Sequence, residues 1–278
     1  MKTILVPVDF SSHSEYALEV AASLARKQNA KIIVLHMMGM HDSYLTKDEK
    51  QEVFNAIYFM KLAKQKFEEL LNKDFLKGIE VTEVVKTHKV FSEINEVARE
   101  YEVDLIVMGS HGTTGMKEVF VGSNTEKVVR TSDVPVLVIK EHITDFKIDK
   151  AVFVTDFNIE TLKSFISARN FFRVFNVEPQ ILFINIPEKF MSTSEMELKA
   201  YNFLIDAGMD NKEFKDRITF YDDYTTERGI YNFCNEAQID AIAIPTHGRK
   251  GLGHFFFGSI GENVANHANV PVITFKMS

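Results

Sequence analysis

Residues 107–127 read VMGSHGTTGMKEVFVGSNTEK, and they continue an apolar run that starts at residue 105. The stretch holds four glycines in a regular arrangement: Gly109, Gly112, Gly115 and Gly122. Glycine has no Cβ, so a backbone rich in it can present successive N–H groups to a ligand at close range. A helix that begins just after Gly122 would add its own unpaired N–H groups and the positive end of its dipole. The stretch therefore predicts a cradle for an anion such as phosphate.

The composition limits the possible classes of protein. A chain of 278 residues is long enough for two domains, and 45% hydrophobic with 26% charged residues is typical of a soluble globular protein. The net charge of −7 argues against a nucleic-acid surface. Cys234 is the only cysteine, which excludes an intrachain disulfide and fits a reducing compartment. The sequence shows neither a secretory signal nor an apolar run that could span a membrane, so we expect a cytoplasmic protein without a membrane partner.

The chain consists of two copies of one unit. Residues 4–10 (ILVPVDF) return as 151–157 (AVFVTDF), the glycine stretch 112–123 returns as 248–259, and 133–140 returns as 269–276. Asp156 lies 147 residues after its counterpart Asp9, whereas Gly258 lies only 136 residues after its counterpart Gly122. The first copy therefore carries eleven more residues in its middle. We therefore predict two domains, 1–143 and 144–278.

Each copy predicts strands that alternate with helices. Short apolar runs followed by amphipathic stretches indicate a parallel sheet with right-handed crossovers. The helix after the first strand is expected to open with a Ser12-x-x-Glu15 capping box. The expected strands cover residues 4–8, 31–36, 79–85, 104–108 and 134–139 in the first copy, and 151–155, 180–185, 217–221, 241–245 and 270–276 in the second. The expected helices include 47–71, 92–101, 124–130 and 195–208.

The glycine spacing carries a family resemblance. Gly109-x2-Gly112-x9-Gly122-Ser123 matches the nucleotide-binding signature of the universal stress protein (UspA) family, which the chain resembles from end to end. The resemblance implies two tandem Rossmann-like (adenine nucleotide alpha hydrolase-like) α/β domains. Each would be an open five-stranded parallel sheet of order 3-2-1-4-5 with helices on both faces. Because family members commonly dimerise through the last strand, we expect an intrachain pseudo-dimer in which residues 134–139 face residues 270–275, with a homodimer left open.

The resemblance also implies an ATP site in the first copy, with Mg²⁺ held by the phosphates. Asp9 would accept hydrogen bonds from ribose or adenine, although a helix cap is an alternative role for an Asp in such a turn. Met37 and Met38 would edge the adenine, and three glycines would hold the phosphates. The full set of expected cofactor-binding residues is Pro7, Val8, Asp9, Met37, Met38, Met108, Gly109, Gly112, Gly122, Ser123, Asn124 and Thr125.

The second copy departs from the signature, because Pro245 replaces the first glycine. Proline has no N–H and fixes φ near about −65°, so one phosphate donor is lost and the loop is stiffened. Arg249 and Lys250 add positive charge that the first copy lacks. We predict a weaker second site at Asp156, Gly248, Gly258 and Ser259.

Catalytic signatures are missing from the sequence. It contains neither a Gly-x4-Gly-Lys-Ser/Thr loop nor a Gly-x-Ser-x-Gly elbow, and no metal-ligand spacing surrounds His111 or His247. We therefore predict no catalytic or metal residues, and at most slow ATP hydrolysis. The predicted function is an ATP-binding stress-response regulator that acts on an unknown protein partner. The alternatives are a protein-interaction scaffold without nucleotide, and a weak ATPase or phosphoryl-transfer enzyme.

Overall fold

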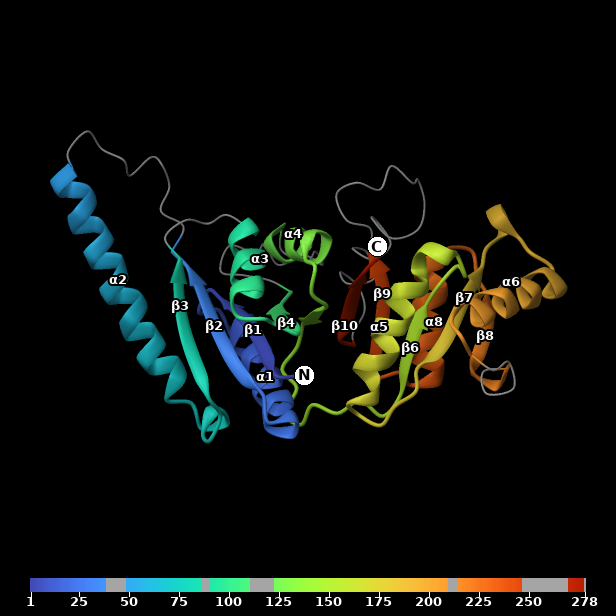
Figure 1. The fold of residues 1–278 in the computed structure, drawn as a ribbon, viewed down its shortest axis with the longest axis horizontal. Helices are drawn as coiled ribbons and strands as arrows, with labels where there is room; N and C mark the ends of the chain where they lie inside the picture. Colours follow the sequence, from blue (N-terminus) through green and yellow to red (C-terminus); the bar gives the residue numbers. More distant parts are fainter. Residues whose placement is uncertain (39–48, 87–90, 111–122, 210–214, 247–269, 278) are drawn as a thin grey trace. The chain divides into compact units, whose positions relative to one another are not determined.

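The computed structural model describes residues 1–38, 49–86, 91–110, 123–209, 215–246 and 270–277 (Figure 1). The chain divides into two compact units. Unit 1 runs from Met1 and includes Ile139–Phe146, whereas unit 2 runs from Lys147 and also includes Val129–Val138. The domain boundary near residue 143 stays a prediction.

Unit 1 holds a parallel sheet in which β3 pairs with β2, β2 with β1, and β1 with β4. The apolar runs form these strands because both faces of such a sheet are covered, and β1 is buried at five of its six residues. The strands are β1 (Thr3–Val8), β2 (Lys31–Met37), β3 (Val81–Lys86) and β4 (Leu105–Gly109). The helices are α1 (Ser12–Gln28), α2 (Glu49–Leu71), η2 (Asp74–Leu76), α3 (Phe91–Glu100) and α4 (Ser123–Thr131).

Helix α1 packs through small apolar residues at helical spacing. Ala17, Val20, Ala21 and Leu24 are all fully buried. The predicted capping box at Ser12 is wrong by one residue, because Ser11 is the N-cap and its hydroxyl accepts the Ser14 N–H at 3.3 Å. Ser11 is the N-cap because the Asp9 carboxylate accepts its backbone N–H and so fixes its backbone.

Unit 2 repeats the sheet and adds a strand from the first copy. Strand β10 pairs with β9, β9 with β6, β6 with β7, and β7 with β8, all in parallel. On its other edge β10 pairs antiparallel with β5, as Leu137 opposite Ile273 shows. The two final strands therefore face one another, as the sequence predicted. The strands are β5 (Val136–Ile139), β6 (Ala151–Val154), β7 (Gln180–Asn185), β8 (Ile218–Asp222), β9 (Ala241–Thr246) and β10 (Val272–Lys276).

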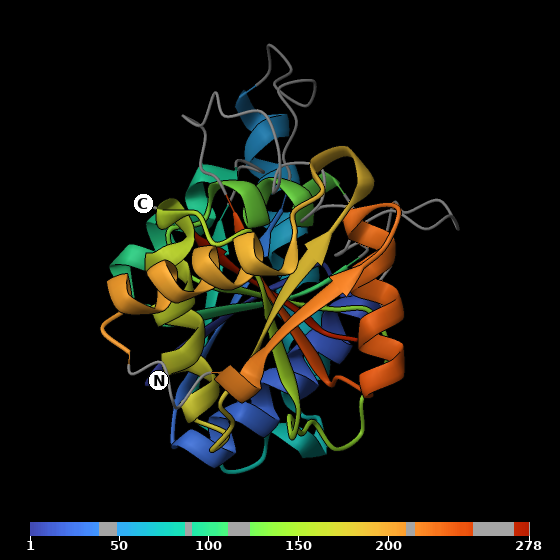
Figure 2. The same ribbon diagram turned by 90° about the vertical axis from the view of Figure 1, so that its right-hand side faces the viewer.

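Helices cover both faces of the sheet in unit 2. Figure 2 shows α5 (Leu162–Arg173) and α6 (Thr193–Asp206) on one side of the strands and α8 (Thr226–Ala237) on the other. The remaining elements are short 3₁₀ turns: η3 (Ile159–Thr161), η4 (Pro187–Lys189) and η5 (Lys215–Arg217). The predicted α/β class with mostly parallel strands is confirmed. Among the described helices, none is both long and apolar enough to cross a membrane.

Candidate functional site

The carboxyl ends of three strands of unit 1 meet at one edge of the sheet. Val8, at the end of β1, pairs with His36 near the end of β2. On the other side Leu5 pairs with Ile106, and the same register three residues on brings Val8 level with Gly109 at the end of β4. Ligands of open parallel sheets bind beyond this edge, where the crossovers diverge. The structure thus gathers the first residues of the predicted site.

Asp9 shapes the turn from β1 into α1. Its Oδ1 accepts the Ser11 N–H at 3.0 Å and the Ser11 hydroxyl at 2.6 Å. Phe10 between them takes a left-handed φ of 62°, which is uncommon for a residue with a bulky side chain. Asp9 is therefore not the N-cap itself but holds the N-cap residue in place. This supporting role is compatible with a ligand contact at the partly exposed carboxylate.

Gly109 joins three elements at the end of β4. A Cβ added there would lie 2.6 Å from the carbonyl oxygen of His13 in α1, a distance that no side chain tolerates. The Gly109 carbonyl accepts the hydroxyl of Thr125 at 2.8 Å. The next N–H, of Ser110, donates to the carbonyl of Ile139 at 2.9 Å. The strand end, the first turn of α1 and the first turn of α4 are thus fixed against one another.

The first turn of α4 supplies the described part of the predicted phosphate cradle. The helix begins at Ser123, directly after Gly122, as predicted. Its first N–H groups have no partner within the helix and carry a partial positive charge. Thr125 is 3% exposed and gives its hydroxyl hydrogen to Gly109, so its side chain positions the helix rather than donating to a phosphate. Asn124 is partly exposed at the same turn.

The residues expected beside the nucleoside differ in their exposure. Val8 and Met108 are 5% and 6% exposed and belong largely to the core. Pro7, Met37 and Met38 are partly exposed. The Met38 N–H donates to the Lys86 carbonyl at 2.9 Å, so an adenine contact at Met38 would use its carbonyl or its side chain.

Sequence reasoning missed His36 and Phe10. The His36 Nδ1 lies 2.8 Å from the Val8 carbonyl, and because a carbonyl only accepts, this nitrogen is the donor. The His36 ring also contacts the Phe10 ring at a centroid distance of 4.5 Å. The sequence repeat offers a signal for His36, because the second copy has Phe183 at the matching position of β7.

Several predicted site residues lie outside the described part of the chain. They are Gly112, Gly122, Gly248, Gly258 and Ser259, together with the side chain of Ser123. Also outside it are His111, His247, Arg249 and Lys250. Their proposed contacts stay predictions.

Unit 2 repeats the turn and surrounds it with phenylalanine rings, whereas in unit 1 the equivalent Phe10 packs against His36 and Phe67. Asp156, 8% exposed, accepts the Asn158 N–H at 3.1 Å through Oδ1, and Phe157 has a φ of 58°. The Phe157 ring stacks on Phe183 at 5.6 Å and 11°, and it meets Phe203 edge-on at 5.6 Å. The Asp and the strained Phe are thus features of the fold, whereas the polar His36 is specific to unit 1.

The strand ends of unit 2 are also tied down by their own residues. Asn185 occupies the position that matches Met38, and its carboxamide accepts the Met191 N–H at 3.0 Å and donates to the Met191 carbonyl at 3.2 Å. The same amide donates to Asp222 at 2.9 Å. Pro245 lies within β9, in register with Phe275. Asn185 thus ties the end of β7 to the end of β8 and to the chain that follows β7.

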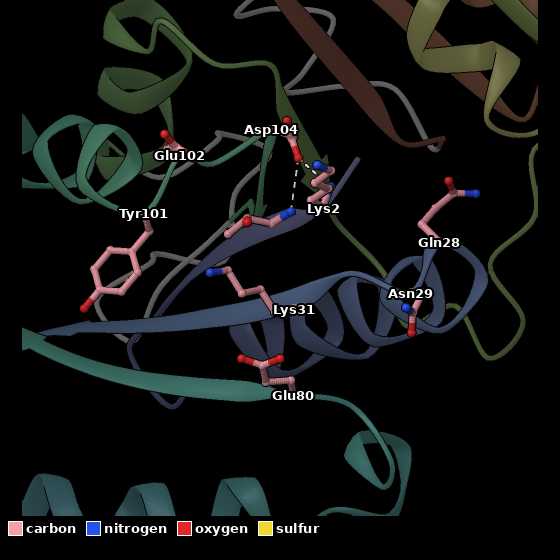
Figure 3. A pocket seen from close by; sticks show the side chains of 9 residues that line it. Lys2, Gln28, Asn29, Lys31, Glu80, Tyr101, Glu102 and Asp104 are labelled. Atoms are coloured by element: carbon pink, nitrogen blue, oxygen red, sulfur yellow. Dashed lines mark hydrogen bonds between the residues drawn. The ribbon is translucent and has the colours of Figure 1, made fainter.

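A polar pocket lies at the opposite edge of unit 1, at the amino ends of its strands (Figure 3). Within it, Asp104 accepts the backbone N–H groups of Lys2 and Thr3. Unit 2 repeats this arrangement, with Asp240 accepting the N–H groups of residues 149 and 150 at 2.9 and 2.7 Å. The clamp fixes the start of the first strand in both copies, so it is a feature of the fold.

Among the residues that the structure describes, burial strongly shifts the pKa of two groups. Burial lowers the pKa of Lys140, directly after β5, to about 8. Its counterpart Lys276 forms an ion pair with Asp133. Burial raises the pKa of the Cys234 thiol to about 12, which makes it unreactive at neutral pH. Over the described ranges, no three His, Cys, Asp or Glu side chains are arranged as metal ligands.

Parallel strands in both units and helices on both faces of the sheet in unit 2 define the class: an open α/β protein with a mostly parallel sheet. The sequence profile of the Universal stress protein family matches residues 1–140 and 187–276, and the chain belongs to this family.

Relatives and solved structures agree with this assignment. Universal stress protein MJ0577 of Methanocaldococcus jannaschii is 29% identical over 158 residues, which cover 50% of this chain and 94% of the relative. Universal stress protein YxiE of Bacillus subtilis is 32% identical over 145 residues, or 49% of this chain and 97% of the relative. The crystal structure of a universal stress protein from Archaeoglobus fulgidus superimposes with a TM-score of 0.71 at 20% identity, covering 99% of this chain and 96% of that one. This last likeness shows the fold of the whole tandem chain.

Proposed function

We propose that the protein binds ATP with Mg²⁺, mainly in unit 1, and acts as a nucleotide-dependent regulator of a stress response. The observation that carries the proposal is the junction at Gly109. There the glycine end of β4 lies against α1 and is tied to the first turn of α4 by Thr125. This junction aims a helix N-terminus at the edge where the family signature expects phosphates.

Unit 2 supports the proposal by contrast. It keeps the Asp156 turn but has Pro245 in place of the glycine. Phe183 replaces His36 and stacks on Phe157. We therefore assign at most a weak or altered site to Asp156 and the glycine loop of the second copy.

The regulatory part of the proposal follows from the lack of a catalytic signature in the sequence. Fast phosphoryl transfer requires a positioned base and charge stabilisation, which glycine N–H groups alone do not supply. We propose slow ATP turnover at most, and signalling to an unknown protein partner in the cytoplasm. The Mg²⁺ would be held by phosphate oxygens.

The test compares two matched variants in a binding assay with Mg-ATP, Mg-ADP and AMP. Asp9→Asn and Asp156→Asn change the same turn in the two copies, so the second variant is the matched control for the first. We expect Asp9→Asn to weaken ATP binding by about tenfold, since a hydrogen bond to a charged group contributes about 1.5–3 kcal/mol. Asp156→Asn should leave the affinity unchanged within about twofold. Equal loss in both variants would contradict the assignment to unit 1.

One observation favours the scaffold alternative. Helix α6 exposes three large apolar side chains at helical spacing: Leu198 at 61%, Tyr201 at 43% and Ile205 at 52%. Such a face is typical of protein contacts. If no adenine nucleotide binds the wild type, this alternative is the better account of the protein.

A further inference from the structure

A histidine and aromatic cluster lies on α1, outside the residues assigned to the nucleotide. His13, Tyr16 and Glu19 are spaced three residues apart and so lie along one side of the helix. The His13 and Tyr16 rings are 5.9 Å apart, and the Tyr16 and His142 rings are 5.1 Å apart. His142 Nε2 lies 2.7 Å from Glu19 Oε2. We call His13, Tyr16, Glu19 and His142 the α1 cluster.

His142 belongs to the segment that leads from β5 to the second copy. This connecting segment, Ile139–Phe146, is part of unit 1. Further along it, the Phe146 carbonyl accepts the ammonium group of Lys27 at 2.8 Å, and the Phe146 side chain is 2% exposed. The connecting segment is therefore fastened to α1 at two points, one near each end of the helix.

The other end of the α1 cluster touches the proposed phosphate cradle. Gly109 packs against His13, whose carbonyl oxygen and carbonyl carbon lie 2.6 and 2.7 Å from the position of a Cβ added at Gly109. No side chain would fit between the two backbones, and interiors packed this closely transmit displacement. A restraint on Gly109 therefore restrains the first turn of α1, which the Asp9–Ser11 contacts hold from the other side.

The repeat shows that the strand-to-helix turn does not require this cluster. In the second copy the positions of His13, Tyr16 and Glu19 are occupied by Glu160, Lys163 and Ile166. That copy still forms the equivalent turn, with Asp156 and a left-handed Phe157. The α1 cluster is thus specific to the copy that carries the intact nucleotide signature.

We infer that the α1 cluster transmits occupancy of the phosphate cradle to the connecting segment, so that bound nucleotide holds this segment against α1. The inference rests on the proposed function, because it needs a nucleotide at Gly109. Bound phosphate restrains the Gly109 backbone, which steadies His13 and the Tyr16–His142 contact. Tyr16 and His142 act here as positioning residues, since they are separated from the cradle by His13.

The test measures amide hydrogen exchange in residues 140–146 of the full chain, with and without Mg-ATP. We expect saturating Mg-ATP to slow this exchange by about threefold or more in the wild type, because fewer local openings then separate the segment from α1. Tyr16→Ala should still bind ATP within about threefold of the wild-type affinity but lose the slowing. Lys163→Ala, the matched change on the exposed position of unit 2, should behave like the wild type.

His142→Ala provides a second, exposed variant in case Tyr16→Ala weakens the fold, and it should also lose the slowing. Slowing that persists in His142→Ala, or in a folded Tyr16→Ala, would overturn the inference. So would a wild type that binds ATP without any change in these amides, and this result would leave the proposed function intact. A wild type that binds no nucleotide would overturn the proposed function and the inference together.

Discussion

At the scale of single residues, Gly109 serves both the fold and the proposed site. The fold needs it because His13 leaves no room for a Cβ, and the site needs it because a glycine lets a ligand approach the backbone. The second copy dispenses with it at Pro245. The requirement for glycine at this position therefore comes from the local packing of unit 1 and is not shared by the second copy.

The substitution Gly109→Ala tests this packing. Because the added Cβ meets backbone atoms of α1 that cannot rotate away, we expect a loss of about 1–3 kcal/mol in the free energy of unfolding, measured in urea. Gly229→Ala is the control, because there the added Cβ meets side-chain atoms of Ile184 first, and helix propensity offsets part of the strain. A Gly109→Ala protein as stable as the wild type would contradict the described contact.

Lys140 gives a pH-dependent prediction. Its folded pKa of about 8 lies below the ordinary value of 10.5, so the unfolded chain binds the proton more tightly. The wild type should therefore gain stability as the pH rises from about 8 to about 10.5. Lys140→Met should be more stable than the wild type below about pH 8, by about 1 kcal/mol after allowance for partial exposure, and this advantage should vanish by about pH 10.5. Urea unfolding over this pH range decides it, and an advantage that does not change with pH would refute the assignment to Lys140.

The sequence predicted the positions of Asp9 and Gly109 in the fold better than it predicted the contacts of individual side chains. Asp9 and Gly109 were expected at the carboxyl edge, and the structure places them there. Thr125 was expected to contact a ligand, but its hydroxyl is used by Gly109, a partner sixteen residues away that no local pattern indicates. His36 was missed for the same reason, because its partner Val8 lies in the neighbouring strand.

At the scale of elements, local sequence signals predicted the presence of the helices and strands more accurately than their first and last residues. Strands β5 and β10 begin at Val136 and Val272, two residues later than expected, because Pro135 and Pro271 have no N–H for the sheet. A capping box does occur at Ser192 and Glu195, where it begins α6 at Thr193 instead of residue 195. The helix after β6 begins with the 3₁₀ turn η3, which no periodicity signalled.

The N-caps of α1 and α8 provide a prediction at this scale. Ser11→Ala and Thr225→Ala each remove a side chain that accepts a backbone N–H at the start of a helix, so each should cost about 1 kcal/mol of unfolding free energy. Only Ser11 is held by Asp9. We therefore expect Ser11→Ala alone to weaken ATP binding, which titration of both purified variants would show. Equal ATP affinities in the two variants would show that the N-cap of α1 does not contribute to the nucleotide site.

At the scale of the whole molecule, the repeat is the most informative feature. Contacts present in both copies, such as the Asp104 and Asp240 clamps, belong to the fold. Contacts present in only one copy indicate where the functions of the two copies have diverged. The repeat is visible in the sequence itself, and the facing of β5 and β10 was expected because family members commonly dimerise through the last strand and an apolar edge strand must be covered. The sequence could not predict the aromatic filling of unit 2, which requires side chains from two strands, a helix and the turn after β6 to meet.

The most direct test of the account is the number of ATP molecules bound per chain, measured by calorimetry with Mg²⁺ on the wild type, Gly122→Val and Gly258→Val. The two variants add the same branched side chain at matching glycines of the two signatures. We predict one ATP site per chain, which is lost in Gly122→Val and kept in Gly258→Val. Two equal sites, or binding that only Gly258→Val abolishes, would contradict it.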